Sequence, residues 1–164
     1  MLSMLASSTT LADLSLDVLS RGASLRFLAT GASMHPFIRD GDFVTLGPLL
    51  DHRPGIGDIV AFMDPRTERL TVHRVVGRKG GLLITKGDAA PRPDGPVPEV
   101  EILGCVTGIE RNGRRVLLGV GPGRIAIALL SRCGFSFGAC APLWRFVRWG
   151  RRFPGVTGKR GKLV

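Results

Sequence analysis

Short apolar runs interrupted by Gly, Pro and Asp dominate the sequence from Leu25 onward. With 23 glycines and 11 prolines, these two residue types make up about a fifth of the 164-residue chain. Both residues disfavour the interior of a helix, whereas both are common in the turns between short strands. The pattern therefore predicts a turn-rich, mainly β domain, and the length allows one core of ordinary size.

Turn residues divide this region into the expected strands. Gly-Asp turns begin the apolar runs at 41–44 and 57–60, because an aspartate carboxylate can accept hydrogen bonds from turn amides. Asn112-Gly113 suits a type I′ hairpin turn. Residues 91–98 contain four prolines and are expected to form an extended, irregular loop. The expected strands lie near 25–29, 42–46, 57–63, 69–77, 81–86, 100–109 and 114–118.

Both ends of the chain differ from this strand-like region. Residues 9–21 resemble a short amphipathic helix, for which Gly22 provides a stop. We therefore expect an N-terminal helix within 1–24, a β domain over 25–120 and a basic, apolar C-terminal extension over 121–164. The tail after about 155 is glycine-rich and basic, and is expected to be disordered.

Charge is distributed unevenly along the chain. Residues 1–110 contain 11 Lys/Arg and 13 Asp/Glu, whereas 111–164 contain 12 Lys/Arg and no acid. Arginines alternate with Ile, Leu, Trp and Phe over 124–149, as in segments that lie in a membrane interface. An anionic membrane surface is thus one expected partner, although a pair of core-packing helices with a solvated basic face explains the pattern equally well. Nucleic acid is not expected, because no recognisable binding module accompanies the charge.

The three cysteines give no sign of a metal centre or a disulfide framework. Cys105, Cys133 and Cys140 have no metal-ligand spacing, and their number is odd, so we expect reduced thiols that bind no metal. The sequence also lacks an uncharged apolar run of about 18 residues, the length that a membrane span requires. We therefore expect a cytoplasmic or peripheral membrane location.

A serine, a histidine and two aspartates lie beside the expected strands. Ser33 is in a turn of small residues, His73 interrupts an apolar run, and Asp88 and Asp94 follow the next strand. A serine hydroxyl needs a neighbouring base to act as a nucleophile, and histidine can fill that role near neutral pH. An aspartate behind the imidazole stabilises the required tautomer. Taken alone, however, these residue types are more often a turn serine, a half-buried strand histidine and turn-stabilising aspartates.

Four motifs, in order, resemble those of the type I signal peptidases. Residues 31–44 fit Gly-x-Ser-Met-x-Pro-x-Ile-x-x-Gly-Asp-x-Val, the nucleophile motif of that family. Residues 57–62 (Gly-Asp-Ile-Val-Ala-Phe) are similar to its next strand, 73–76 (His-Arg-Val-Val) to its base motif, and 86–94 to its final motif. The resemblance covers about 31–106. Histidine at the base position resembles the archaeal and endoplasmic-reticulum branch, since most bacterial members have lysine there.

The resemblance implies a role for each of these residues. Ser33 would be the nucleophile, and its backbone N–H the main donor of the oxyanion hole. His73 would be the general base. Asp94 matches the acid nearest to the base, while Asp88 would shape its turn or share that role, so the choice between them stays open.

The resemblance also implies a fold and an activity. The fold would be a coiled antiparallel β-barrel of the signal peptidase/LexA type, with short helices at both ends. The activity would be that of a cofactor-free serine endopeptidase that cleaves leader or signal peptides after small residues through an acyl-enzyme. Met34 and Pro36 would shape the turn and the floor of the substrate cleft.

Two other functions fit the same residues. One is a LexA-like cytoplasmic peptidase that processes its own chain, although such proteins usually pair serine with lysine and carry an N-terminal DNA-binding helix-turn-helix. The other is a catalytically silent module that binds peptides in the same groove. The complete set of Ser33, His73 and Asp94 favours an enzyme over such a module.

Overall fold

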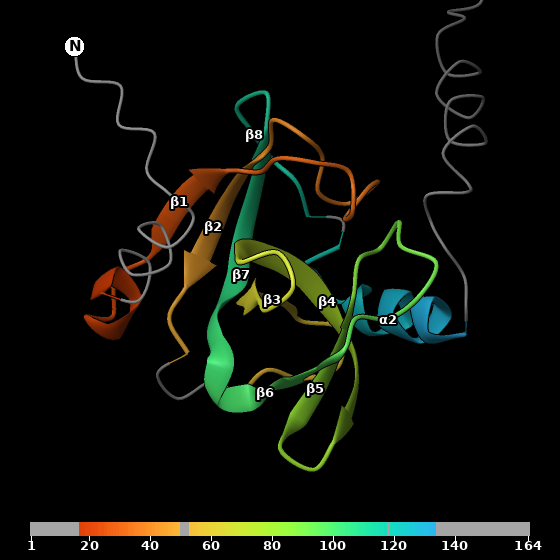
Figure 1. Cartoon of the computed structure of the whole chain (residues 1–164). Coiled ribbons are helices and arrows are strands. Elements are labelled where there is room, and N and C mark those ends of the chain that lie inside the picture. The colour runs from red at the N-terminus through yellow and green to blue at the C-terminus, as the bar shows by residue number, and fades with distance from the viewer. Residues whose placement is uncertain (1–16, 50–52, 118, 134–164) are drawn as a thin grey trace, which may run out of the picture.

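A computed structural model describes residues 17–49, 53–117 and 119–133 (Figure 1). Strands are the main regular structure of this region, and its two longer helical segments lie near its ends. Residues 17–20 are helical, and the other helices are η1 (Glu99–Glu101) and α2 (Arg124–Arg132). The strands are β1 (Leu25–Leu28), β2 (Phe43–Gly47), β3 (Ile59–Asp64), β4 (Arg69–Lys79), β5 (Leu82–Lys86), β6 (Pro96–Pro98), β7 (Ile102–Arg111) and β8 (Arg114–Arg115).

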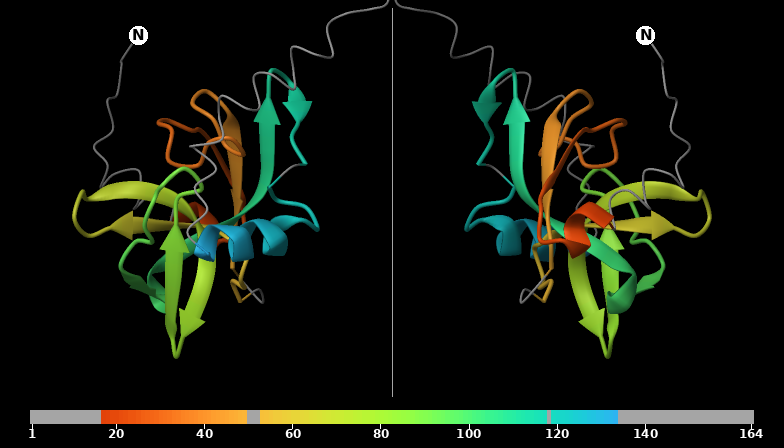
Figure 2. Two further views of the ribbon diagram at one scale, coloured as in Figure 1. Left: turned by 90° about the vertical axis from the view of Figure 1, so that its right-hand side faces the viewer. Right: turned by 90° about the vertical axis from the view of Figure 1, so that its left-hand side faces the viewer.

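The strands form one antiparallel sheet in the order β1-β2-β7-β3-β4-β5-β6, and β8 pairs with the end of β7. Register shifts interrupt the β2–β7, β3–β7 and β4–β5 pairings. Such irregularities increase the twist of a sheet, and the two halves of this sheet run in different directions (Figures 1 and 2). The expectation of a mainly β, antiparallel domain is confirmed.

The expected closure into a barrel is not found in the described part of the chain. There, β1 pairs only with β2, and β6 pairs only with β5, so these strands are the two edges of an open sheet. The short β6 begins and ends with proline, which has no N–H to donate to a further strand. This edge therefore cannot extend a regular ladder toward β1.

Most of the expected strands are present within a few residues of their predicted bounds. The Asn112-Gly113 turn is also confirmed, with φ angles of 52° and 72° that suit a type I′ hairpin. The loop expected over 91–98 is in part wrong, because its end forms β6. Proline is compatible with this position since β6 is an edge strand.

Two clusters of buried side chains form the core. The larger lies between β1, β2, β3, β7, the turn that follows β1 and the 17–20 helix, and the smaller lies between β3, β4, β5, β6 and β7. Members of the larger cluster include Leu19, Met34, Ile38, Val44, Leu46, Ile59 and Ile109. Members of the smaller include Val60, Phe62, Val75, Leu83, Val97 and Ile102.

Helix α2 packs on the sheet at β4. At its first residue, Arg124 forms an ion pair of 2.7 Å with Asp58. Near its end, Ser131 accepts a hydrogen bond of 2.8 Å from the buried Lys86 at its carbonyl and one of 3.1 Å at its hydroxyl. Polar contacts at both ends thus hold the helix against the β domain.

Some expectations lie outside the described residues. These are the start of the N-terminal helix over 9–16, Cys140, and the character of the C-terminal extension after residue 133. The domain bounds at 24 and 120 stay predictions. Among the described residues, no helix has the length and apolar character needed to cross a membrane.

The approach of α2 to Gly57 gives a test of this packing. We expect Gly57→Ala to lower the free energy of unfolding by about 2 kcal/mol or more. The residue has a φ of +98°, and an added Cβ would lie 2.9 Å from the backbone carbon of Arg124. Chemical denaturation of the purified variant measures the loss.

Gly80→Ala is the matched control for Gly57→Ala. Gly80 also has a positive φ, of +59°, but an added Cβ would meet nothing within 4 Å. We therefore expect only the backbone cost, about 1 kcal/mol. Equal losses for the two variants would contradict the packing of α2 against Gly57.

Candidate active site

The turn that carries Ser33 lies between β1 and β2. Its backbone is closed by hydrogen bonds from His35 N to the Ala32 carbonyl and from Phe37 N to the Met34 carbonyl, both of 3.1 Å. Gly31, with a φ of +92°, begins the turn, and its N–H donates to Asp40 Oδ1 at 2.9 Å. Ser33 itself is exposed. The turn therefore presents the serine at the surface on a hydrogen-bonded backbone.

His73 lies on β4 and is oriented by Asp94. Its Nδ1 lies 2.6 Å from Asp94 Oδ2, and only 12% and 15% of the two side chains are exposed. Thr85 holds the aspartate through a hydrogen bond of 2.9 Å from its hydroxyl to Oδ2. The Asp94 N–H in turn donates to the Thr85 carbonyl at 2.8 Å. Phe62 packs against the imidazole with ring centroids 6.3 Å apart. The ring is thus held by contacts that leave Nε2 for another partner.

Ser33 and His73 meet at Gly87, directly after β5. A Cβ added at Gly87 would lie 3.1 Å from His73 Nε2, 3.3 Å from Ser33 Cβ and 2.7 Å from the Ser33 carbonyl oxygen. That carbonyl also accepts a hydrogen bond of 2.8 Å from Ala89 N. The absence of a side chain at Gly87 therefore allows the serine turn and the Nε2 edge of the imidazole to approach the same point.

The serine hydroxyl and the imidazole are near each other without being bonded. Among the described residues, the Ser33 hydroxyl forms no hydrogen bond to His73 Nε2, and the Ser33 backbone N–H has no acceptor. Hydrogen bonds of a catalytic serine are often long without a substrate and shorten when one binds. A backbone N–H without an acceptor beside a nucleophile is the donor that an oxyanion hole needs.

Asp88 has a different partner. Its two carboxylate oxygens accept hydrogen bonds from Nε and Nη2 of Arg74, both of 2.8 Å, and neither side chain is exposed to solvent. Nη1 of Arg74 donates to the carbonyls of Gly57 and Gly119 at 2.9 and 2.7 Å. In this structure Asp94, and not Asp88, contacts His73, while Asp88 pairs with the arginine that follows the histidine.

The other predicted site residues contribute to the turn. Met34 is buried in the larger core cluster, and Pro36 is half-buried. Contact of either residue with a substrate stays a prediction. Among the described residues, no group of three or more His, Cys, Asp and Glu side chains is arranged to hold a metal ion.

Three residues of the site carried little sequence signal. Arg74 reads as one charged residue inside an apolar strand, Thr85 as an ordinary strand residue, and Gly87 as part of a turn. Their roles depend on segments that are distant in sequence. The one local hint is a charged residue within a buried strand, because a buried arginine requires a partner.

Comparisons of the chain with protein-family models, with curated proteins and with solved structures found no match.

The different settings of the two aspartates predict different effects on stability. We expect Asp88→Asn to lower the free energy of unfolding by about 3 to 5 kcal/mol, because the buried Arg74 would lose its counter-charge. Asp94→Asn is the matched control and should cost about 1 to 2 kcal/mol, since Asp94 is partly exposed and is not the partner of a buried arginine. Urea denaturation of both variants measures these losses. A larger loss for Asp94→Asn would contradict the assignment of Asp88 as the structural acid.

Lys86 predicts a dependence of stability on pH. Burial lowers the pKa of its ammonium from the ordinary value of 10.5, and the charge of Asp88 opposes this shift only in part. Between the lowered pKa and 10.5, the unfolded chain binds more protons at this position than the folded chain, so this contribution to stability increases as the pH rises.

The measurement compares wild type with Lys86→Met by denaturation at several pH values from 7 toward the ordinary pKa of 10.5. We expect the unfolding free energy of wild type to rise relative to that of Lys86→Met as the pH increases. The contributions of the other titratable groups cancel when the two proteins are compared. A difference that is constant with pH, or that changes in favour of Lys86→Met, would contradict this assignment.

Proposed function

We propose that this protein is a serine endopeptidase of the signal peptidase type, in which Ser33 is the nucleophile, His73 the general base and Asp94 the acid that orients the base. The observation that carries the proposal is the meeting of the Asp94–His73 pair and the serine turn at Gly87. The three side chains come from separate parts of the chain. Their order in space, acid to imidazole to hydroxyl, is the order that nucleophilic acyl transfer requires.

Each step of the reaction has a residue suited to it. His73 Nε2 takes the proton of the Ser33 hydroxyl as its oxygen attacks a peptide carbonyl, and Asp94 stabilises the imidazolium through Nδ1. The Ser33 N–H donates to the oxyanion. The imidazolium returns the proton to the leaving amine, which yields an acyl-enzyme. A water molecule activated by the same imidazole then releases the acid and restores the serine.

The substrate class follows from the resemblance in the four motifs. We propose leader or signal peptides with small residues before the scissile bond, and a strand arrangement related to the signal peptidase/LexA type. A peripheral association with an anionic membrane surface, through the basic C-terminal segment, is part of this proposal. The +12 balance of residues 111–164, with 12 Lys/Arg and no acid, supports that part.

The test is cleavage of a mixed peptide library with small-x-small sites, read by mass spectrometry in the presence of lipid vesicles. We expect wild type to cut after small residues and both Ser33→Ala and His73→Ala to lose about 10³-fold or more in rate, because the hydroxyl and its base act as a unit. Asp94→Asn should lose about 10²-fold or more, since the imidazole would no longer be held in the required tautomer.

Ser20→Ala is the matched control, because it removes an exposed hydroxyl that bonds only locally to the Asp17 carbonyl. It should cleave at the wild-type rate. Cuts that survive Ser33→Ala would disprove the assignment of the nucleophile. A folded wild type that cuts nothing, but binds the peptides, would favour the silent peptide-binding module.

A further inference from the structure

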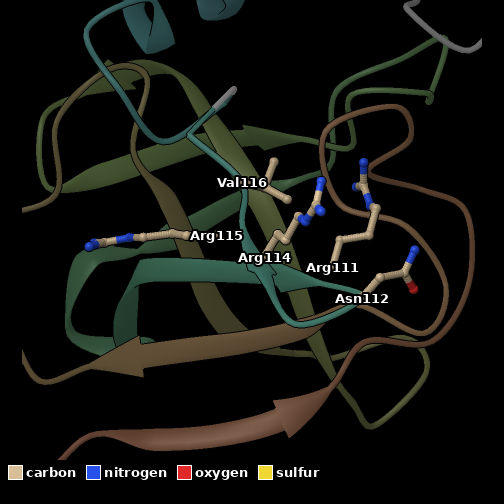
Figure 3. A pocket seen from close by; sticks show the side chains of 5 residues that line it. All are labelled: Arg111, Asn112, Arg114, Arg115 and Val116. Atoms are coloured by element: carbon tan, nitrogen blue, oxygen red, sulfur yellow. The ribbon is translucent and has the colours of Figure 1, made fainter.

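A hollow of about 490 Å³ lies at the hairpin between β7 and β8 (Figure 3). It is lined by one apolar side chain, one amide and three guanidinium-bearing residues: Val116, Asn112, Arg111, Arg114 and Arg115. In Figure 3 the side chains of Arg111 and Arg114 extend to the same side of the hairpin, whereas Arg115 extends the opposite way. The proposed reaction uses none of these residues.

The arginines of the hollow differ in whether their charge is compensated. Arg111 donates to both carboxylate oxygens of the buried Asp42, at 2.8 and 2.7 Å. Within the described part of the chain, the side chains of Arg114 and Arg115 form neither a hydrogen bond nor an ion pair, and both are exposed, but Arg115 extends away from the other two (Figure 3). The guanidinium of Arg114 is therefore available to an anion on the same side as Arg111, which an internal partner holds in place.

The hollow borders the serine turn. Nη2 of Arg111 donates to the Phe37 carbonyl at 3.1 Å, and Phe37 follows Ser33 by four residues within a closed turn. Burial, together with the positive charges of Arg39 and Arg111, lowers the pKa of His35 in the same turn. The positive potential of the hollow thus extends to the loop that carries the proposed nucleophile.

We propose that this hollow binds the carboxylate of an Asp or Glu side chain of the peptide substrate, with Arg114 as its main donor. The inference rests on the proposed peptidase function and adds a specificity element to it. Because the hollow borders the serine turn and not Ser33 itself, the acidic residue would lie a few residues from the scissile bond of an extended peptide, which advances about 3.3 Å per residue. Guanidinium and carboxylate match in charge and can form two parallel hydrogen bonds.

A peptide fits this hollow better than a polyanionic surface does. A phosphate-rich surface is best bound by a row of cations that have no internal partner, whereas Arg111 already forms an ion pair with Asp42. Through Arg111 the hollow also adjoins the serine turn, where a peptide would be bound for cleavage. Both features favour a single carboxylate on a bound substrate.

The experiment compares matched peptides that carry Glu or Gln at each position three to five residues from a small-x-small site. For wild type we expect kcat/KM to be about threefold to tenfold higher for Glu at one of these positions, mainly through KM. Arg114→Gln should lose this preference while it cleaves the Gln peptide at the wild-type rate. The preference should also weaken at about 0.5 M salt, where charges on the surface are strongly screened.

Lys79→Gln is the matched control, because it removes an exposed positive charge at the β4–β5 hairpin, at the opposite end of Figure 1 from β8. It should keep the preference for Glu. Equal cleavage of Glu and Gln peptides by wild type would overturn the inference and leave the peptidase proposal intact. So would an unchanged preference in Arg114→Gln.

Binding of the same peptides to Ser33→Ala separates failure of the inference from failure of the proposed function. If wild type cleaves neither peptide but Ser33→Ala binds the Glu peptide more tightly, in a way that depends on Arg114, the anion site stands and the peptidase proposal falls. If Ser33→Ala shows no such preference for the Glu peptide, the proposed anion site is overturned as well. If Arg114→Gln instead weakens binding only to vesicles of anionic phospholipid, a membrane surface replaces the peptide as the ligand and the inference is overturned.

Discussion

The buried ion pair between Arg74 and Asp88 is the interaction on which the arrangement of the site depends. Removing two charges from water is costly, and their attraction offsets this cost only when every polar atom is also hydrogen-bonded. Here the arginine meets both oxygens of Asp88 and the carbonyls of Gly57 and Gly119, and its guanidinium lies 5.4 Å from the ring centre of Phe37. One side chain thereby joins β4, the turn after β5, the loop before β3, the segment before α2 and the serine turn.

Two residues of the site, His73 and Gly87, directly precede the members of this pair in sequence. His73 precedes Arg74 on β4, and successive side chains of a strand point to opposite faces, so burial of the arginine directs the histidine outward. Gly87 precedes Asp88 in the same way, and it allows the approach of the serine turn to the imidazole. The pairing of Arg74 with Asp88 thus determines where His73 and Gly87 lie. This explains why a site at the surface can be rigid although Ser33 itself lies in a turn.

Local features of the fold could be predicted from the sequence, and pairings between distant segments could not. The Asn112-Gly113 hairpin turn and most strand positions follow from backbone preferences within a few residues. The strand β6 was missed because its prolines indicate a loop, and only its position at an edge makes it compatible with a sheet. The sheet is open for a related reason, because the edge formed by β6 does not pair with β1. Spacing alone could not decide between Asp88 and Asp94, because the choice depends on which of them faces Arg74 in the folded chain.

The sequence shows an excess of cations in the C-terminal part of the chain, but not which of them are paired. The sequence places 12 Lys/Arg and no acid after residue 110, which indicates a polyanionic partner for the whole segment. In the fold, acids from the first part of the chain compensate some of these charges, since Asp42 pairs with Arg111 and Asp58 with Arg124. These cations stabilise the structure, because Arg124 holds α2 against the β domain and Arg111 joins the end of β7 to Asp42 and the Phe37 carbonyl. Arg114 lies three residues beyond Arg111 and has no such partner among the described residues. Cations that the fold does not pair, such as Arg114, are available for binding, and the folded structure is needed to identify them.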